Sequence, residues 1–234
     1  MISSVLKYAS SQLNPRILER MMVYGILRRE FPELKTVPVF SNREQLWALG
    51  LEGIQGRDRA ITYVEFGVYR GDSIRHFAQA NANPESLFVG LDSFEGLPEK
   101  WGTRGTVGQF NVEGQIPKID DSRVRFLKGW FQNTWDQLQA LIEGRNNLVV
   151  HYDADLYSST LFTLARIDSL GLPYTAFFDE FTGEETRALY NYKESFNASV
   201  SFLGTVLCQG YPLKLLTRIV PQAAQRAAAA AHTA

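Results

Sequence analysis

Short apolar runs alternate with amphipathic segments from about residue 60 onward. The apolar runs have the length of strands, and the segments between them are long enough for helices. This alternation is typical of parallel strands joined by crossover helices, which bury a sheet on both faces. The predicted strands are about residues 61–66, 87–91, 123–127, 147–152 and 174–178.

Two further apolar runs, residues 200–207 and 213–219, are separated by a turn at Gly210 and are typical of a closing antiparallel pair. We therefore predict an α/β fold. It is a Rossmann-like three-layer sandwich with a mainly parallel, seven-stranded sheet, an antiparallel last strand and additional amino-terminal helices.

The first sixty residues are predicted to be helical. Asn14 and Pro15 can start a helix, and its spacing gives one apolar face that needs the core or another subunit as a partner, made of Ile17, Leu18, Met21, Met22 and Ile26. A second helix is predicted from a capping box, Ser41 to Glu44, and is ended by Gly53 and Gly56.

Composition narrows the function. The chain has 234 residues, of which 45% are hydrophobic and 21% charged, enough for one compact domain with a full core. The 24 basic and 25 acidic residues give a net charge of -1, which favours neither nucleic acid nor an anionic membrane as a partner. Cys208 is the only cysteine, which excludes an internal disulfide and favours a reducing compartment such as the cytoplasm. We find no signal peptide and no apolar run that could span a bilayer.

The first predicted strand ends on Glu65 and is followed by two glycines, Gly67 and Gly71. Gly67 can bring backbone close to a ligand, and Gly71 can let the next helix approach the strand. An acid in this place repels a pyrophosphate and suits a cationic group, which favours S-adenosylmethionine (SAM) over a dinucleotide. The alternative is an ordinary strand, turn and helix with a capping acid.

Acids also follow the other predicted strands. In a parallel sheet the carboxyl ends of neighbouring strands form one crevice, so we expect these side chains to converge. Asp92 has the position of a carboxylate that binds ribose hydroxyls, which fits either SAM or a nicotinamide cofactor. The acids at the strand ends are Glu65, Asp92, Asp153, Asp155, Asp179 and Glu180.

Asp153, Asp179 and Glu180 offer hard oxygen ligands, which Mg²⁺ prefers. Such an ion would bind the acceptor hydroxyl, lower its pKa and hold it in line with a transferable methyl group. The alternative without an ion is that Asp179 and Glu180 cap the following helix while Asp153 bonds the cofactor.

Five segments resemble the macrocin O-methyltransferase family, whose members modify sugars and aromatic hydroxyls of antibiotics. The runs from Asp92 to Pro98 (Asp-Ser-Phe-Glu-Gly-Leu-Pro) and from Asp153 to Thr160 are long enough to be specific. The likeness covers about residues 61–182, and its segments are residues 64–71, 90–99, 128–131, 153–160 and 178–181.

The resemblance implies a class I methyltransferase that uses SAM and magnesium to methylate a small-molecule hydroxyl in natural-product biosynthesis. It places Glu65, Gly67 and Gly71 at the methionine end of the cofactor, Asp92 at its ribose, and Gly129 and Trp130 near its adenine. It gives Asp153 a role in both cofactor binding and catalysis. Asp153, Asp179 and Glu180 match the metal ligands of the family. The full set of implied cofactor-binding residues is Glu65, Gly67, Tyr69, Gly71, Ser73, Asp92, Ser93, Phe94, Gly129, Trp130 and Asp153.

The chain departs from the family at Glu180, where a second aspartate is usual. For the general base we favour Asp155 and interpret His151, which lies within an apolar strand, as a core histidine. Residues 101–121 are too long for a simple connection and are predicted to form a flap. The alternative functions are an NAD-dependent oxidoreductase and a member of the fold that has lost turnover.

The predicted organisation has three regions. Residues 1–59 form a helical cap or oligomerisation region, residues 60–222 the methyltransferase domain, and residues 223–234 an alanine-rich tail that is a helical extension, disorder or an added segment. A homo-oligomer through the amino-terminal helices is expected.

Overall fold

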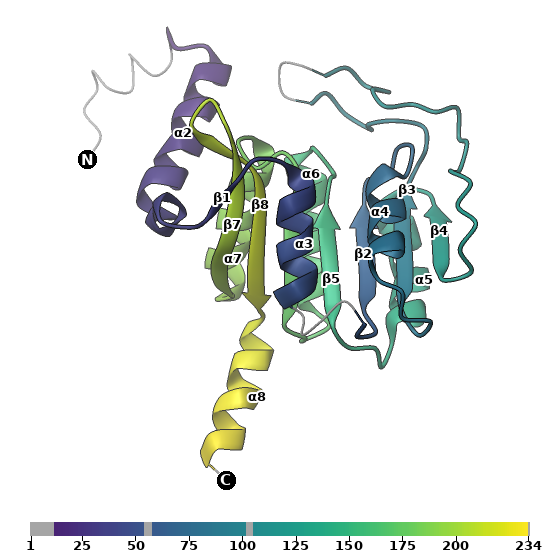
Figure 1. Cartoon of the computed structure of the whole chain (residues 1–234). Helices are drawn as coiled ribbons and strands as arrows, with labels where there is room; N and C mark the ends of the chain where they lie inside the picture. The colour runs from purple at the N-terminus through teal and green to yellow at the C-terminus, as the bar shows by residue number, and fades with distance from the viewer. Residues whose placement is uncertain (1–11, 54–57, 102–104, 234) are drawn as a thin grey trace.

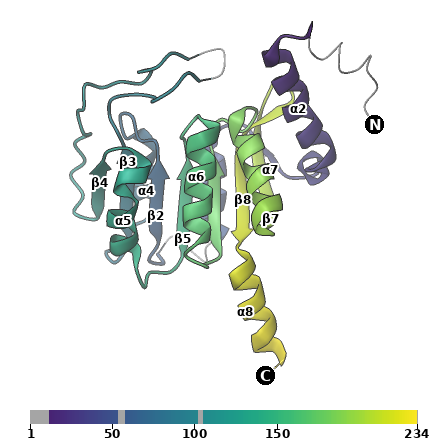
Figure 2. The same cartoon turned by 180° about the vertical axis from the view of Figure 1, so that it is seen from behind.

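The computed structural model describes residues 12–53, 58–101 and 105–233. Within them, helices cover both faces of one sheet (Figure 1; Figure 2), so the predicted three-layer α/β fold is confirmed. The strands follow the spatial order β1-β7-β8-β6-β5-β2-β3-β4. They are β1 (Val39–Phe40), β2 (Thr62–Phe66), β3 (Leu87–Asp92), β4 (Val124–Lys128), β5 (Leu148–Tyr152), β6 (Tyr174–Phe178), β7 (Ser199–Cys208) and β8 (Tyr211–Val220).

The described sheet has eight strands rather than seven, because β1 adds a two-residue parallel edge to β7. The strands β2, β5 and β6 are buried along their whole length, as expected for apolar runs covered on both faces. The last strand, β8, is antiparallel to both β6 and β7, as predicted. Its first residues therefore lie at the carboxyl ends of the parallel strands.

Two cores lie on opposite faces of the sheet. One forms against α3 (Arg43–Gly53) and α4 (Asp72–Ala80), which are in front in Figure 1. The larger core forms on the other face, which Figure 2 shows in front, against the helices α5 (Phe131–Ile142), α6 (Tyr157–Asp168) and α7 (Glu184–Phe196).

The helix α2 (Pro15–Arg29) lies beside α7 and is followed by the 3₁₀ helix η1 (Pro32–Lys35). Of the five residues of its predicted apolar face, only Ile26 packs in the core, beside Val23 and Leu27. The other four side chains are exposed, from 36% for Leu18 to 60% for Met21. Helical spacing alone does not distinguish two overlapping apolar stripes, and tertiary packing selected the other one.

The predicted capping box of α3 is displaced by one residue. Asn42 Oδ1, rather than the Ser41 side chain, accepts a hydrogen bond from Gln45 N at 3.0 Å. Gln45 Oε1 in turn accepts one from Ser41 N at 3.1 Å. The helix ends at Gly53 as predicted, whereas Gly56 lies outside the described residues.

The alanine-rich tail forms a helix, α8 (Gln222–Thr233), that projects from the end of the sheet opposite to α2 and the long loop (Figure 1). None of the helices within the described residues combines the length and apolarity needed to cross a bilayer.

Candidate functional site

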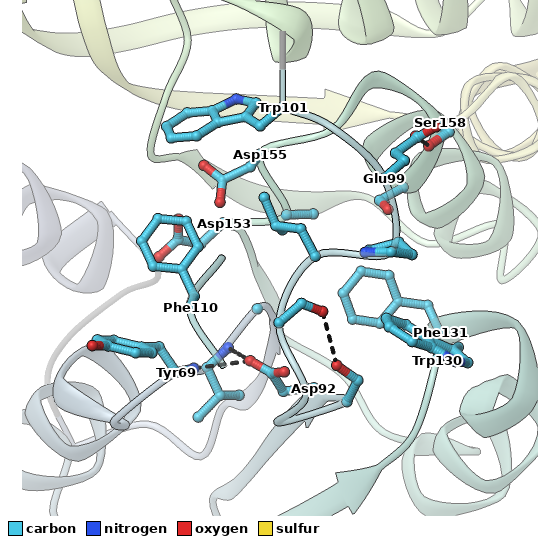
Figure 3. A pocket seen from close by; sticks show the side chains of 18 of the residues that line it. Tyr69, Asp92, Glu99, Trp101, Phe110, Trp130, Phe131, Asp153, Asp155 and Ser158 are labelled. Carbon is cyan, nitrogen blue, oxygen red and sulfur yellow. Dashed lines mark hydrogen bonds between the residues drawn. The ribbon is translucent and has the colours of Figure 1, made fainter. Parts of the chain in front are cut away.

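A cavity of about 630 Å³ lies over the carboxyl ends of the parallel strands (Figure 3). The acids that follow β3, β5 and β6 all reach it, so the predicted convergence occurs for these strands. Its size is in the range of pockets that hold small molecules and cofactors. Of the residues predicted for the site, the following line it: Gly67, Tyr69, Asp92, Ser93, Gly129, Trp130, Asp153, Asp155, Asp179 and Glu180.

Gly67 follows β2 directly and lies against Asp153, the residue that follows the neighbouring parallel strand β5. A Cβ atom on Gly67 would lie 1.9 Å from the backbone oxygen of Asp153, and its φ of +94° is one that side chains rarely adopt. Gly67 N donates to Leu91 O at 3.0 Å, and Asp153 N donates to Phe66 O at 2.9 Å. The close approach of three strand ends therefore requires glycine here.

Asp92 organises the loops that border the cavity. Its Oδ2 accepts hydrogen bonds from Val68 N at 2.8 Å and Tyr69 N at 2.9 Å, and its Oδ1 accepts one from Phe94 N at 2.7 Å. Each carboxylate oxygen can accept more than one bond, so Asp92 can fix the β2–α4 loop and still accept hydroxyl donors from a ligand.

Four other predicted cofactor residues do not line this cavity. Glu65 is fully buried beneath it and accepts a hydrogen bond from Ser73 Oγ. Phe94 belongs to the core, at 1% exposure. Gly71 caps α4 with a φ of +77°, and a Cβ there would meet Pro117 rather than the strand. These four residues support the loops that form the cavity wall but do not reach the cavity themselves. Glu65, for example, is buried below the β2–α4 turn.

The buried carboxyl of Glu65 has an oxygen, Oε2, with no hydrogen-bond partner. Burial raises the pKa of Glu65 to about 8, against the lowering effect of the Ser73 hydrogen bond. On its other side, Oε1 lies 3.6 Å from His151 Nδ1. His151 is 1% exposed and its Nδ1 pairs with the Tyr63 hydroxyl at 2.9 Å, in agreement with the interpretation of a core histidine.

Asp153 and Asp155 point into the cavity (Figure 3). Burial, followed by repulsion from Glu180 and Asp179, raises the pKa of Asp155 to about 7. Burial and the nearby Asp179 also raise the pKa of Asp153. Asp155 adopts a left-handed φ of +58°, which aspartate and asparagine tolerate better than most residues. A carboxyl group with a pKa near neutrality is suited to take a proton.

Asp179 is held by two cationic or polar partners. Lys214 Nζ donates to Asp179 Oδ2 at 2.5 Å and to its backbone oxygen at 2.9 Å. His151 Nε2 lies 3.8 Å from Oδ1. Burial by itself raises the pKa of Asp179, but His151 and Lys214 outweigh it and hold the pKa well below its usual range.

The predicted magnesium ligands therefore do not assemble as an open set of oxygens. Asp153, Asp179 and Glu180 share a cavity wall, but among the described residues no three acidic, histidine or cysteine side chains are grouped so that they could hold an ion. The Lys214 ammonium already occupies Oδ2 of Asp179, and Oδ1 faces His151. In this arrangement the residues do not fit a bound divalent ion.

Aromatic rings form much of the cavity wall. Tyr69 and Trp101 each lie against Phe110, with ring centroids 5.7 Å and 6.1 Å apart. Trp130, on the other side, is 37% exposed and follows β4. Phe110 and Trp101 belong to the predicted flap, so that segment does border the site. Residues 102–104 of the flap lie outside the described residues.

Some residues of the site were not predicted from the sequence. Glu99 Oε1 accepts a hydrogen bond from Ser158 Oγ, which joins the loop after β3 to the start of α6. Lys214 is the most important of them. Its signal in the sequence is a single lysine within the apolar run Leu213–Ile219, but nothing in the pattern says which acid it meets.

A second cavity, of about 530 Å³, adjoins the first, since Trp101 and Glu180 line both. It lies between α2 and the turn from β7 to β8. Tyr24 and Tyr211, whose ring centroids are 4.6 Å apart, belong to its wall. Its lining is therefore aromatic and apolar with more acidic than basic side chains, namely Glu19, Glu180 and Glu184 and the single basic residue Arg20.

The strand order, the single antiparallel strand and the cavity at the carboxyl ends define the fold of class I SAM-dependent methyltransferases. The chain matches the macrocin O-methyltransferase (TylF) family over residues 50–170, and it belongs to this family. The predicted family and enzyme class are thus confirmed. No curated protein matches the chain.

Solved structures show the same fold at low sequence identity. The calicheamicin methyltransferase CalS11 is 18% identical, with a TM-score of 0.54, over 88% of this chain and 93% of that chain. The O-methyltransferase NovP is 22% identical, with a TM-score of 0.53, over 74% and 78%. An O-methyltransferase from Bacillus cereus in complex with SAH is 16% identical, with a TM-score of 0.51, over 93% and 97%.

Proposed function

We propose that this chain transfers the methyl group of SAM to a sugar hydroxyl of a small natural-product acceptor. Membership of the macrocin O-methyltransferase family supports the reaction type. The observation that carries the proposal is the cavity at the strand ends, where Asp92, Asp153 and Asp155 meet. One of the structural neighbours, CalS11, is named as a calicheamicin methyltransferase.

The cavity suits a cofactor that carries a positive charge. Bound SAM supplies an electrophilic methyl group on a sulfonium. The side chain of Asp92 would accept hydrogen bonds from its ribose, Gly67 would let it lie against the backbone, and Trp130 would cover its adenine. Glu65 supports the turn from below, through Ser73.

Asp155 would act as the general base. It would take the proton of the acceptor hydroxyl as the acceptor oxygen attacks the methyl group that SAM would supply, with the electron pair of the broken carbon–sulfur bond left on sulfur. Positioning supplies much of the acceleration in such a displacement. The aromatic wall of Tyr69, Trp101 and Phe110 excludes water from the reacting atoms. No step is assigned to magnesium, because Lys214 holds the relevant Asp179 oxygen.

The charges of the cavity favour a neutral or cationic acceptor over a phosphorylated one. Six acidic side chains line the main cavity, namely Asp92, Glu99, Asp153, Asp155, Asp179 and Glu180. Those that are ionised would repel a pyrophosphate at close range. The adjoining cavity, with Tyr24 and Tyr211, can hold the part of a glycoside that lies beyond the methylated sugar. The acceptor we propose is therefore a finished glycoside rather than a nucleotide-activated sugar.

The test is methyl transfer by the purified protein from SAM to a panel of acceptors. We expect a mass gain of one methyl group on neutral glycosides or amino-sugar glycosides and less product with matched nucleotide-activated sugars. Calorimetry with SAM and with NAD tests the oxidoreductase alternative. We expect the protein to bind SAM and not NAD. Binding of SAM without transfer to any member of a broad panel would favour a member that has lost turnover.

A further inference from the structure

Lys214 is placed in the site by the one antiparallel strand. Because β8 runs against β6, its start lies beside the carboxyl end of β6, and Phe178 pairs with Leu215. Lys214 and Asp179 are the residues just outside this pair. Their side chains are only 17% and 12% exposed, so the ion pair is largely removed from solvent.

A buried lysine is costly unless it is paired, and the neighbours of Lys214 along the strand are apolar. Its ammonium meets both the carboxylate and the backbone oxygen of Asp179. The other carboxylate oxygen faces His151. Each oxygen of Asp179 thus already faces a nitrogen of the protein, one of them a fixed cation.

The surroundings of this pair are rich in acidic side chains. Asp153, Asp155 and Glu180 line the same cavity as Asp179, and Glu185 is fully buried nearby, with Oε2 accepting a hydrogen bond from Glu180 N at 3.1 Å. Buried like charges repel strongly and need a cation close by. A divalent ion is one way to supply that charge, and a lysine is another.

We infer that the Lys214 ammonium takes the place of a divalent ion beside Asp179, so that methyl transfer by this chain requires no added metal. This inference rests on the proposed function. A second cation at the same oxygen would have to displace the ammonium or remain a few ångströms from it, where the repulsion is large. Lys214 is a positioning residue, which fixes the charge and orientation of Asp179 at the wall of the acceptor cavity.

The first experiment needs no variant and no substrate. The wild-type protein is treated with EDTA, dialysed and titrated with MgCl₂ in a calorimeter. Its thermal midpoint is then measured with and without an excess of Mg²⁺, because a bound ion would raise the midpoint. We expect no saturable heat and no rise in the midpoint. Saturable binding of Mg²⁺ to the wild-type protein would overturn the inference, whether or not an acceptor is known.

The second experiment measures turnover. We expect the wild-type rate to be the same with EDTA as with Mg²⁺, and Lys214→Gln to lose roughly 10-fold to 100-fold, the usual effect of removing a partner that orients a site group. Lys214→Arg should recover part of the rate. Lys193→Gln, at an exposed ion pair with Glu194 on α7, is the matched control and should keep the wild-type rate.

The two proposals fail differently. If EDTA abolishes transfer and Mg²⁺ restores it, the role of Lys214 is wrong while the methyltransferase function stands. If no acceptor is methylated under either condition, the proposed function fails and the Mg²⁺ titration still decides on the metal. Should Lys214→Gln not fold, the wild-type titration and the comparison with Lys214→Arg remain decisive.

Discussion

Asp155 is the residue on which the proposed chemistry most depends. It lies in the loop after β5 and its side chain is buried, with 7% of the residue exposed. Burial and the neighbouring carboxylates raise its pKa to about 7. A base with this pKa is ionised for a substantial part of the time at neutral pH and is still able to hold a proton. Its left-handed backbone is also open to asparagine.

Asp155→Asn should therefore lower kcat by roughly 100-fold to 10,000-fold, the usual contribution of a general base, with little change in SAM binding. The rate of the wild-type enzyme should rise with pH through about 7, where Asp155 loses its proton, and the variant should lack this rise. Initial rates between pH 5.5 and 9, about 1.5 to 2 units on either side of that pKa, measure both. A variant with the wild-type rate and the wild-type pH profile would show that another group takes the proton.

The sequence predicted the residues of the site unevenly. Asp92, Asp153, Asp155 and Asp179 could be found because parallel strands deliver their carboxyl ends to one edge, so local position implies proximity. Lys214 could not be placed in the same way. It reaches the site from the antiparallel strand, and its partner depends on strand order, which short-range patterns do not specify. The depth of Glu65 below the cavity likewise depends on which way its strand faces.

At the scale of elements, the long connection after β3 is anchored rather than free over its described part. Val112 N and Gly114 N donate to Phe94 O at 3.3 Å and 2.8 Å, and Lys128 Nζ donates to Gly114 O at 3.0 Å. Gly96 allows the close approach of this segment, since a Cβ there would lie 2.5 Å from the backbone oxygens of Gly108 and Gln109. The hydrogen bonds tie residues 108–114 to the loop after β3.

We expect ligand binding to protect this connection from trypsin. Lys100 and Lys118 lie on either side of the anchored part. Because Trp101 and Phe110 line the cavity, a bound cofactor would contact this connection and hold it against the cavity. Peptide mapping by mass spectrometry with and without SAM measures cleavage at both lysines. Cleavage at Arg226 in α8, remote from the site, is the internal control. Equal cleavage at all three residues with and without SAM would exclude ligand-dependent closure.

The elements that could be predicted best are the buried strands. The bounds of β2, β3, β5 and β6 differ from prediction by one residue at most, because a strand covered on both faces is a continuous apolar run with sharp ends. The edge strand β1 has two residues and no such run. The sequence left open which side of α2 meets the core, because two apolar stripes overlap on it and only the packing against α7 decides between them.

For the whole molecule, we predict that two copies of the chain associate through the exposed stripe of α2. Ile17, Leu18, Met21 and Met22 are 36% to 60% exposed on one helix, and the removal of such a patch from water would stabilise an association. Light scattering with size-exclusion chromatography should give the mass of a dimer, and Met21→Glu should shift it toward the monomer. A wild-type monomer at all accessible concentrations would contradict this prediction.

The global stability should depend on pH through Glu65. Its pKa is 4.5 in ordinary surroundings and about 8 in the fold, so the folded state holds a proton that the unfolded chain releases. The free energy of unfolding should therefore be largest below about pH 4.5 as far as Glu65 is concerned, and fall as the pH rises to about 8, by about 1.4 kcal/mol for each pKa unit of difference.

Glu65→Gln should remove this contribution, because glutamine keeps an acceptor for Ser73 and carries no charge. Urea denaturation at pH 5 and pH 8, on either side of most of the titration, should show the variant gaining stability over the wild type at the higher pH. Part of the slope will remain, since Asp153, Asp155 and Glu185 also have raised pKa values. Glu143→Gln, at an exposed position, is the control. Equal slopes for Glu65→Gln and wild type would mean that Glu65 is ionised in the fold.

The projection of α8 away from the sheet has a practical consequence for handling the enzyme. The helix leaves the end of the sheet opposite to α2 and to the connection after β3 (Figure 1), and residues of that connection line the cavity. A protein tethered through this helix to a resin or a sensor chip would present its opening to the bulk solution. Tethering at α2 would crowd the adjoining hollow that Tyr24 helps to form. Reusable biocatalysts and surface-based binding assays are thus best built from the carboxyl-terminal side.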